Sequence, residues 1–183
     1  MNVFRNKMLN SRLGFTLIET MIVAAIIAIL AGIAIPGFIV WLPNYRLKSA
    51  AQDIYSDLQT AKMLAVKDNS DKTVQFNIGS KTYTKADGTV VDIDEEYSKS
   101  VFYGKGDATE QVDGTSFTGD YVTYSSPDDE ASFNSRGMGN NSGNGGTGFV
   151  YIANSKGKAY AIGSRSSGVV LLRKWDSTAG KWR

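Results

Sequence analysis

The sequence of 183 residues predicts an α+β protein, in which one long N-terminal helix precedes antiparallel strands. The first observation is an uncharged run, residues 21–42, which leads into a segment whose apolar residues recur at helical spacing. The second is a change after residue 69 to alternating apolar and polar residues, a pattern typical of strands. The chain is therefore expected to consist of a helical part followed by a β-rich part.

Residues 1–14 form a short leader, which we exclude from the fold. The leader holds no acidic residue and three cations, Arg5, Lys7 and Arg12. Residues 15–42 follow as the predicted transmembrane and assembly helix. About 20 apolar residues in helical form cross the hydrocarbon core of a bilayer, so the uncharged run is long enough to span it.

A carboxylate, Glu19, lies near the start of this helix, where a lone membrane-embedded charge costs roughly 3 kcal/mol on insertion scales. Three interpretations compete. A secretory signal peptide is cleaved after an apolar region of about 7–15 residues, whereas here Gly14 precedes a longer run. A plain single-pass anchor gives Glu19 no role. Cleavage after Gly14 leaves the amine of Phe15 four residues from Glu19, about one helical turn, where it can pair with the carboxylate of a neighbouring subunit.

Residues 43–69 are predicted to continue the helix as an amphipathic segment. Their apolar residues recur at intervals of three and four, which produces one stripe suited to packing on a sheet. The stripe consists of Leu47, Ala50, Ala51, Ile54, Leu58, Ala61 and Ala65. Pro36 and Pro43 each remove a backbone donor, so kinks or local melting are expected at both.

Residues 70–183 are predicted to form the β-rich domain. The first expected strands cover 74–78, 81–84, 90–93, 100–103 and 120–124, with a hairpin turn at Asp87-Gly88. Residues 134–148 are rich in Gly, Asn and Ser and are predicted to be a loop. The clearest β pattern is a three-stranded meander over 149–152, 159–162 and 169–172.

The composition argues against an enzyme. The sequence contains no histidine, which removes the usual general base and the commonest transition-metal ligand, and no cysteine for a disulfide. A calcium site is conceivable at four acidic residues that do not follow EF-hand spacing, and a solvated acidic loop is the favoured alternative: Asp92, Asp94, Glu95 and Glu96. We predict a non-enzymatic protein without cofactor or metal; an anchored enzyme is the least favoured class.

Charge is distributed unevenly along the β-rich domain. Residues 87–130 hold 12 acidic side chains against two lysines, whereas residues 131–183 hold eight cations against one aspartate. Such asymmetry indicates either a charged interaction surface or two segments that neutralise each other in the fold.

The C-terminal segment interleaves cations with indoles, at Arg173, Lys174, Trp175, Lys181, Trp182 and Arg183. This composition suits a nucleic-acid strand, with phosphates on the cations and bases stacked on the rings. The alternative is a chain end whose tryptophans cover the sheet.

The segment Gly14-Phe15-Thr16-Leu17-Ile18-Glu19, between a basic leader and an apolar helix, resembles the prepilin N-terminal signature of type IV pilins and type II secretion pseudopilins. The resemblance implies a pilin-like architecture, in which the second half of the long helix packs on an antiparallel sheet. It also implies a prepilin peptidase that cuts between Gly14 and Phe15 and N-methylates Phe15. Glu19 would be the assembly carboxylate.

Three looser similarities point to the FimT and GspH class of minor pilins and pseudopilins. They are residues 45–51 leading into Leu58 and Ala61, the strand Val74-Gln75-Phe76, and the segment 133–137 before a glycine-rich turn and the final meander. FimT-like pilins that capture DNA carry basic residues near the C-terminal end, often after a glycine. Here Gly168 is followed by Val169 and Val170, so that pattern is not reproduced.

The resemblance therefore implies a non-enzymatic minor pilin or pseudopilin, with a DNA-binding minor pilin that acts in DNA uptake as the alternative. Before assembly it would be a single-pass protein of the inner membrane, with residues 70–183 in the periplasm. Its partners would be the prepilin peptidase, other pilins or pseudopilins in a filament and, in the alternative, DNA. Secretion and pilus machineries are equally compatible with these residues.

Overall fold

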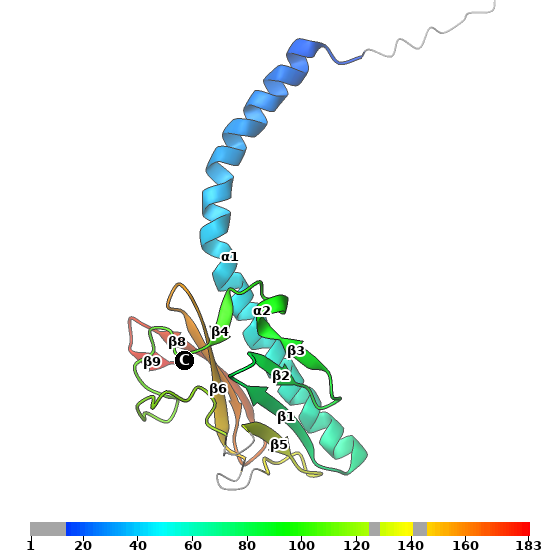
Figure 1. Ribbon diagram of the computed structural model, residues 1–183, viewed down its shortest axis with the longest axis vertical. Coiled ribbons are helices and arrows are strands. Elements are labelled where there is room, and N and C mark those ends of the chain that lie inside the picture. The colour runs from blue at the N-terminus through cyan, green and yellow to red at the C-terminus, as the bar shows by residue number, and fades with distance from the viewer. Residues whose placement is uncertain (1–13, 125–128, 141–145) are drawn as a thin grey trace, which may run out of the picture. The chain divides into compact units, whose positions relative to one another are not determined.

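The computed structural model describes residues 14–124, 129–140 and 146–183 (Figure 1). The chain divides into two units, Met1–Ile39 and Val40–Arg183. Helix α1 (Leu17–Asp68) belongs to both, which confirms the long N-terminal helix. The expectation of local melting at Pro36 and Pro43 is wrong, because α1 is helical through both residues. Each proline removes a single backbone hydrogen-bond donor, and the flanking helical turns keep their donors.

The end of α1 has a local cause in the sequence. Asn69 adopts a left-handed conformation with φ 48°. The amide of Ser70 then donates to the carbonyl of Ala65 at 3.2 Å, the bond of a Schellman motif. Asparagine tolerates this conformation better than most residues, so the helix stops one residue before the predicted limit.

Four strands form the first sheet, in the order β3-β2-β1-β5 and with every pair antiparallel. The strands are β1 (Lys72–Asn77), β2 (Thr82–Thr84), β3 (Val90–Asp92) and β5 (Glu130–Phe133). The hairpin predicted at Asp87-Gly88 is confirmed between β2 and β3. Gly88 has φ 88°, and the amide of Lys85 donates to the carbonyl of Thr89 at 2.8 Å.

Five strands form the second sheet, in the order β4-β6-β7-β8-β9. They are β4 (Val101–Tyr103), β6 (Gly148–Asn154), β7 (Ala159–Ser164), β8 (Val170–Asp176) and β9 (Lys181–Trp182). The antiparallel pairs β6–β7 and β7–β8 confirm the predicted meander. Together with α1, the two antiparallel sheets confirm the predicted α+β, pilin-like layout.

The core of the second unit is built on the apolar stripe of α1. All seven predicted stripe residues are buried, at 1% exposure or less. They belong to one cluster with side chains of both sheets, including Val74 and Phe76 of β1 and Val150 and Ile152 of β6. Figure 1 shows the second half of α1 running behind β1, β2 and β3. The pattern identified in the sequence therefore locates the surface on which the sheets pack.

Two tyrosines tie the first sheet and its neighbouring loop to the polar flank of α1. The hydroxyl of Tyr83 donates to Asp57 at 2.8 Å, and that of Tyr97 donates to Asp53 at 2.8 Å. Lys85 forms an ion pair with Asp57 at 3.2 Å. Burial and the aspartate acceptor together raise the pKa of Tyr83 and of Tyr97 well above the ordinary value, so both hydroxyls remain donors at any physiological pH.

The structure differs from the predicted strands in two places. Ile93 begins the short helix α2 (Ile93–Glu96) instead of ending a strand, because the side chain of Asp92 accepts hydrogen bonds from the amides of Asp94 and Glu95. The segment 120–124 forms no strand and only an isolated bridge between Val122 and Val150.

Two short strands, β5 and β9, were not predicted. β5 gains its hydrogen bonds from β1, which is far away in the chain, and β9 gains its hydrogen bonds from β8, which comes just before it. Neither segment has a long enough alternation of apolar and polar residues to predict a strand by itself.

Replacing Leu58 by alanine should lower the free energy of unfolding by about 2–5 kcal/mol, because the cavity would open where α1 contacts both sheets. The matched control is Met63→Ala on the same helix, where the side chain is 63% exposed and the change should stay within about 0.5 kcal/mol. Urea unfolding followed by near-UV circular dichroism measures both. Equal effects of the two substitutions would contradict the assignment of the stripe.

Candidate functional site

The first part of α1 presents an uncovered apolar surface. From residue 14 to residue 41 every side chain is exposed except that of Ala31, which is half-buried. Phe15, at 81% exposure, and Leu17, at 77%, are extreme for residues of their size. α1 contains a stretch that is long and apolar enough to cross a membrane. Lipid chains or the helices of other subunits are the environments that can cover such a surface.

The start of α1 is capped by Thr16. Its hydroxyl accepts a hydrogen bond from the amide of Glu19 at 3.3 Å, and its carbonyl accepts one from Thr20 at 3.2 Å. Thr16 is thus the N-cap and Glu19 the third helical residue, the positions of a capping box. Our sequence analysis did not assign this cap, although the spacing Thr-x-x-Glu signals it. The consequence is that Glu19 lies in the first turn, where the helix dipole favours a negative charge.

The three residues expected to act in processing and assembly lie together at this end of the chain. Phe15 and Glu19 are both exposed. Apart from the chain neighbours of Gly14, no atom of the described residues lies within 4 Å of the position that a Cβ would occupy. Packing against the described residues therefore does not require glycine at this position.

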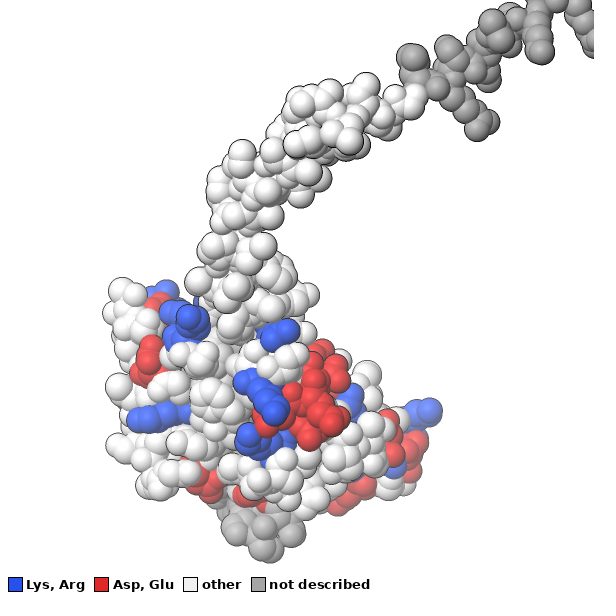
Figure 2. Space-filling view, turned by 45° about the horizontal axis from the view of Figure 1, so that its top comes forward, with Lys and Arg blue, Asp and Glu red and all other residues white. Residues whose placement is uncertain are grey.

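The ion pairs bear on the two interpretations of the charge asymmetry. Among the residues that the structure describes, the pairs include Lys72–Asp68, Lys81–Asp94, Lys85–Asp57 and Arg183–Asp176. None of these four joins the acidic segment 87–130 to the basic segment 131–183. Figure 2 shows acidic and basic atoms on the surface of the second unit, with one dense acidic group bordered directly by basic atoms and further acidic atoms elsewhere on the same face.

Two of the four acidic residues considered for calcium have structural partners. Asp92 caps α2, and Asp94 accepts from the Lys81 ammonium at 2.7 Å. Within the described parts of the chain, no three acidic side chains converge in a way that could hold a metal ion.

The C-terminal segment brings its six predicted DNA-contact residues onto β8, β9 and the last residue. Trp175 pairs with Trp182 across the two strands, and Lys174 exchanges backbone hydrogen bonds with Arg183 at 2.8 and 2.9 Å. Arg183 also forms an ion pair with Asp176 at 2.9 Å. Pairing of the strands therefore concentrates cations at one edge of the second sheet.

The indoles of this segment are packed on the sheet. Trp175 is 4% exposed, and its ring meets that of Trp182 edge-on at 5.3 Å. Trp182 is half-buried, contacts Tyr151 at 5.5 Å between centroids, and donates its indole NH to the carbonyl of Glu110 at 2.8 Å. A nucleic-acid base needs an open ring face for stacking, and Trp175 does not offer one.

The chain matches the family model for the prokaryotic N-terminal methylation motif over residues 9–35. It is also similar to two curated proteins of Pseudomonas aeruginosa, each called fimbrial protein, with 39% identity over 83 residues. The matched region covers 42% of this chain and 53% of each relative, so the chain spans about half the length of the curated relatives it matches. No solved structure matches significantly. The motif and the relatives together support the pilin superfamily.

We expect no complex when the protein is titrated against single- or double-stranded DNA at low salt in a gel-shift assay, because the indoles are packed and acidic groups share the surface. The comparison is a variant with Arg173, Lys174, Lys181 and Arg183 replaced by alanine. A wild-type complex would contradict the expectation under two conditions. The logarithm of its affinity would have to fall against the logarithm of salt concentration with a slope of roughly 0.7–0.9 per phosphate contacted, and the alanine variant would have to show a flatter slope.

Proposed function

We propose that this protein is a non-enzymatic, membrane-anchored subunit of a type IV pilus or type II secretion filament, which assembles through α1 after removal of residues 1–14. The observation that carries the proposal is the methylation motif, which coincides with an exposed apolar helix that has Glu19 in its first turn. The fimbrial relatives support the same class.

Processing would create the charge that assembly requires. In the precursor the nitrogen of Phe15 belongs to a neutral amide. Hydrolysis of the bond between Gly14 and Phe15 converts it into an amine, which carries a positive charge at neutral pH. Methylation of that amine leaves the charge in place and increases its apolar surface. The prepilin peptidase is the proposed enzyme for both steps.

Assembly would then neutralise two charges in the apolar interior of the filament. The exposed positions of Phe15 and Glu19 leave both groups open to neighbouring subunits. Four helical residues correspond to about 6 Å along the axis, so an amine and a carboxylate of adjacent subunits meet when their helices are staggered by that amount. An unpaired carboxylate among apolar helices is costly, and the pairing removes this cost for correctly staggered neighbours only.

We assign the subunit to the minor pilins or pseudopilins of the FimT and GspH class, from the segment Phe133-Asn134-Ser135-Arg136-Gly137. Its residues have separate physical roles here. Phe133 is fully buried, and the Asn134 side chain accepts from the amides of Arg136 and Met138 at 2.9 and 3.1 Å. Gly137 has φ 71° and lies against Lys62 and Val66 of α1. These roles support a motif that docks the turn after β5 on the helix.

Capture of DNA during uptake is the second candidate function. It is favoured by the four cations that β8, β9 and the chain end gather at one sheet edge, and it is weakened by the packing of both indoles.

Replacing Gly14 by leucine should block removal of the leader, because the bulky side chain would obstruct the peptidase next to the bond it cuts. Intact-mass spectrometry of membranes from cells that contain the peptidase should show a mature wild-type protein that begins at methylated Phe15, and a variant that retains residues 1–14. Gly14→Ala is the control and should still be processed, at least in part. A wild-type protein that keeps its leader in such cells would refute the proposal.

Replacing Glu19 by alanine should leave insertion into the membrane intact or improve it by roughly 3 kcal/mol on insertion scales, since a buried carboxylate is removed. Incorporation into filaments should nevertheless fall, because the Phe15 amine of a neighbour would lose its counter-charge. Membrane fractionation and immunoblotting of sheared filaments measure the two effects separately. Glu19→Gln keeps the shape without the charge and should fail in the same way; normal incorporation of either variant would exclude the pairing.

A further inference from the structure

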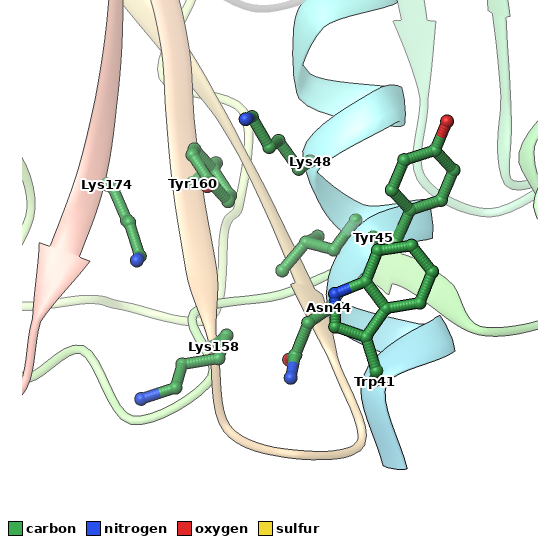
Figure 3. A pocket seen from close by; sticks show the side chains of 8 residues that line it. Trp41, Asn44, Tyr45, Lys48, Lys158, Tyr160 and Lys174 are labelled. Carbon is green, nitrogen blue, oxygen red and sulfur yellow. The ribbon is translucent and has the colours of Figure 1, made fainter. Parts of the chain in front are cut away.

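A hollow of about 330 Å³ lies between the second half of α1 and the second sheet. Residues 41–48 of α1 form one wall, and Lys158, Tyr160 and Lys174 form the other. In Figure 3 the ammonium of Lys48 extends from α1 toward the second sheet, and Lys158 and Lys174 come from the opposite wall, with the ammonium of Lys158 directed away from α1. The hollow lies wholly within the second unit.

The hollow is lined by three lysines, of which Lys174 also interacts electrostatically with Asp176 outside it. Lys48, Lys158 and Lys174 are exposed, and none of them forms an ion pair with a carboxylate among the described residues. None of the described side chains that line the hollow is acidic. The nearest carboxylate of an adjoining hollow, Asp176, is already paired with Arg183. Three lysines along one hollow attract an anion, such as a phosphate, that can accept hydrogen bonds from their ammonium groups.

The position of the hollow along α1 indicates the source of that anion. The uncharged run ends at Leu42, and Lys48 follows six residues later, about 9 Å along a helix. The polar headgroup region of a bilayer extends about 5–8 Å beyond each side of its hydrocarbon core. Lys48 therefore lies about 1–4 Å beyond this region when the uncharged run spans the core, and its long, flexible side chain can reach back to the lipid phosphates.

Aromatic residues occupy the same level. The rings of Trp41 and Tyr45 are stacked, with centroids 4.9 Å apart, at 52% and 54% exposure. Tryptophan and tyrosine are enriched at the boundary between membrane and water, where an apolar ring and a polar tip are both accommodated. The β6–β7 turn is held beside this part of α1 by a hydrogen bond from Asn154 to Asn44 at 2.9 Å, which brings Lys158 to the same end.

We propose that this hollow binds the phosphate of an anionic phospholipid, such as phosphatidylglycerol, in the membrane that α1 crosses. Lys48, Lys158 and Lys174 bind the phosphate, and the half-buried Tyr160 provides an apolar wall for the glycerol backbone. The lipid holds the second unit against the membrane surface before assembly. The inference goes beyond filament assembly and requires only that α1 spans a bilayer, so its failure would leave the proposed function standing.

The test uses the full chain in neutral maltoside micelles, with lipid binding counted by native mass spectrometry. Dimyristoyl phosphatidylglycerol should bind in preference to dimyristoyl phosphatidylcholine, which has the same chains but no net charge. The triple variant Lys48→Gln, Lys158→Gln, Lys174→Gln should lose this preference by at least tenfold, since each juxtamembrane lysine contributes about fivefold to the attraction of anionic lipid.

The matched control removes the same charge from the other end of the second unit, in the variant Lys67→Gln, Arg136→Gln, Arg165→Gln. Lys67 is about 28 Å from Lys48 along α1. Arg136 and Arg165 belong to turns whose glycines, Gly137 and Gly168, contact Lys62. The control should keep the lipid preference. Thermal unfolding of both triple variants shows whether a loss of lipid preference results from a loss of folding. The single substitution Lys158→Gln, at an exposed position, is a milder change that serves the same purpose.

Four outcomes would overturn the proposal. Equal binding of the two lipids by the wild-type protein would exclude an anion site. Equal losses in both triple variants would show attraction by overall charge alone. Displacement of the lipid by excess inorganic phosphate would assign the hollow to free phosphate. Displacement by a short single-stranded DNA would assign it to nucleic acid.

Discussion

Burial of one stripe of α1 between two sheets is the interaction on which the second unit depends. The main cluster joins both sheets to the helix: β1 and β6 both contribute to the cluster that contains Leu47, Ile54 and Leu58. Four of the seven stripe residues are alanines, which allow a close approach of helix and strands. The helix must therefore dock for the sheet faces that meet it to exclude water, whereas the second sheet also carries smaller apolar clusters without α1.

Polar contacts on both flanks of the stripe determine how the sheets are placed. On the flank toward the first sheet, Asp53 and Asp57 accept from the hydroxyls of Tyr97 and Tyr83. On the side of the second sheet, Lys62 donates to the carbonyl of Gly168 at 2.9 Å. The apolar stripe provides most of the free energy of docking but little direction, whereas these hydrogen bonds are directional and specify one arrangement.

The same helix serves two environments because its two parts differ in pattern. Before residue 42 it is apolar on all faces and remains exposed, and after residue 43 only one stripe is apolar and buried. Under the proposed function, membrane anchoring and filament assembly would depend on the first pattern, and display of a folded domain on the second. The proposed lipid site lies where the patterns change, because cationic side chains no longer carry the cost of burial in hydrocarbon once the apolar run meets water.

The sequence by itself determined the elements whose signals are local. The apolar run, the seven-residue stripe, the hairpin at Asp87-Gly88 and the final meander were all predicted, because each depends on the periodicity of adjacent residues or on turn chemistry. The signature that contains Gly14, Phe15 and Glu19 was identified for the same reason, since its residues lie in one contiguous segment. Tertiary structure alone decided the partners of β5 and β9, the packing of Trp175 and Trp182, and the placement of Lys48, Lys158 and Lys174 along one hollow. These lysines are separated by up to 126 positions in the chain, and no local pattern encodes contacts that exist only after a helix and two sheets have packed together.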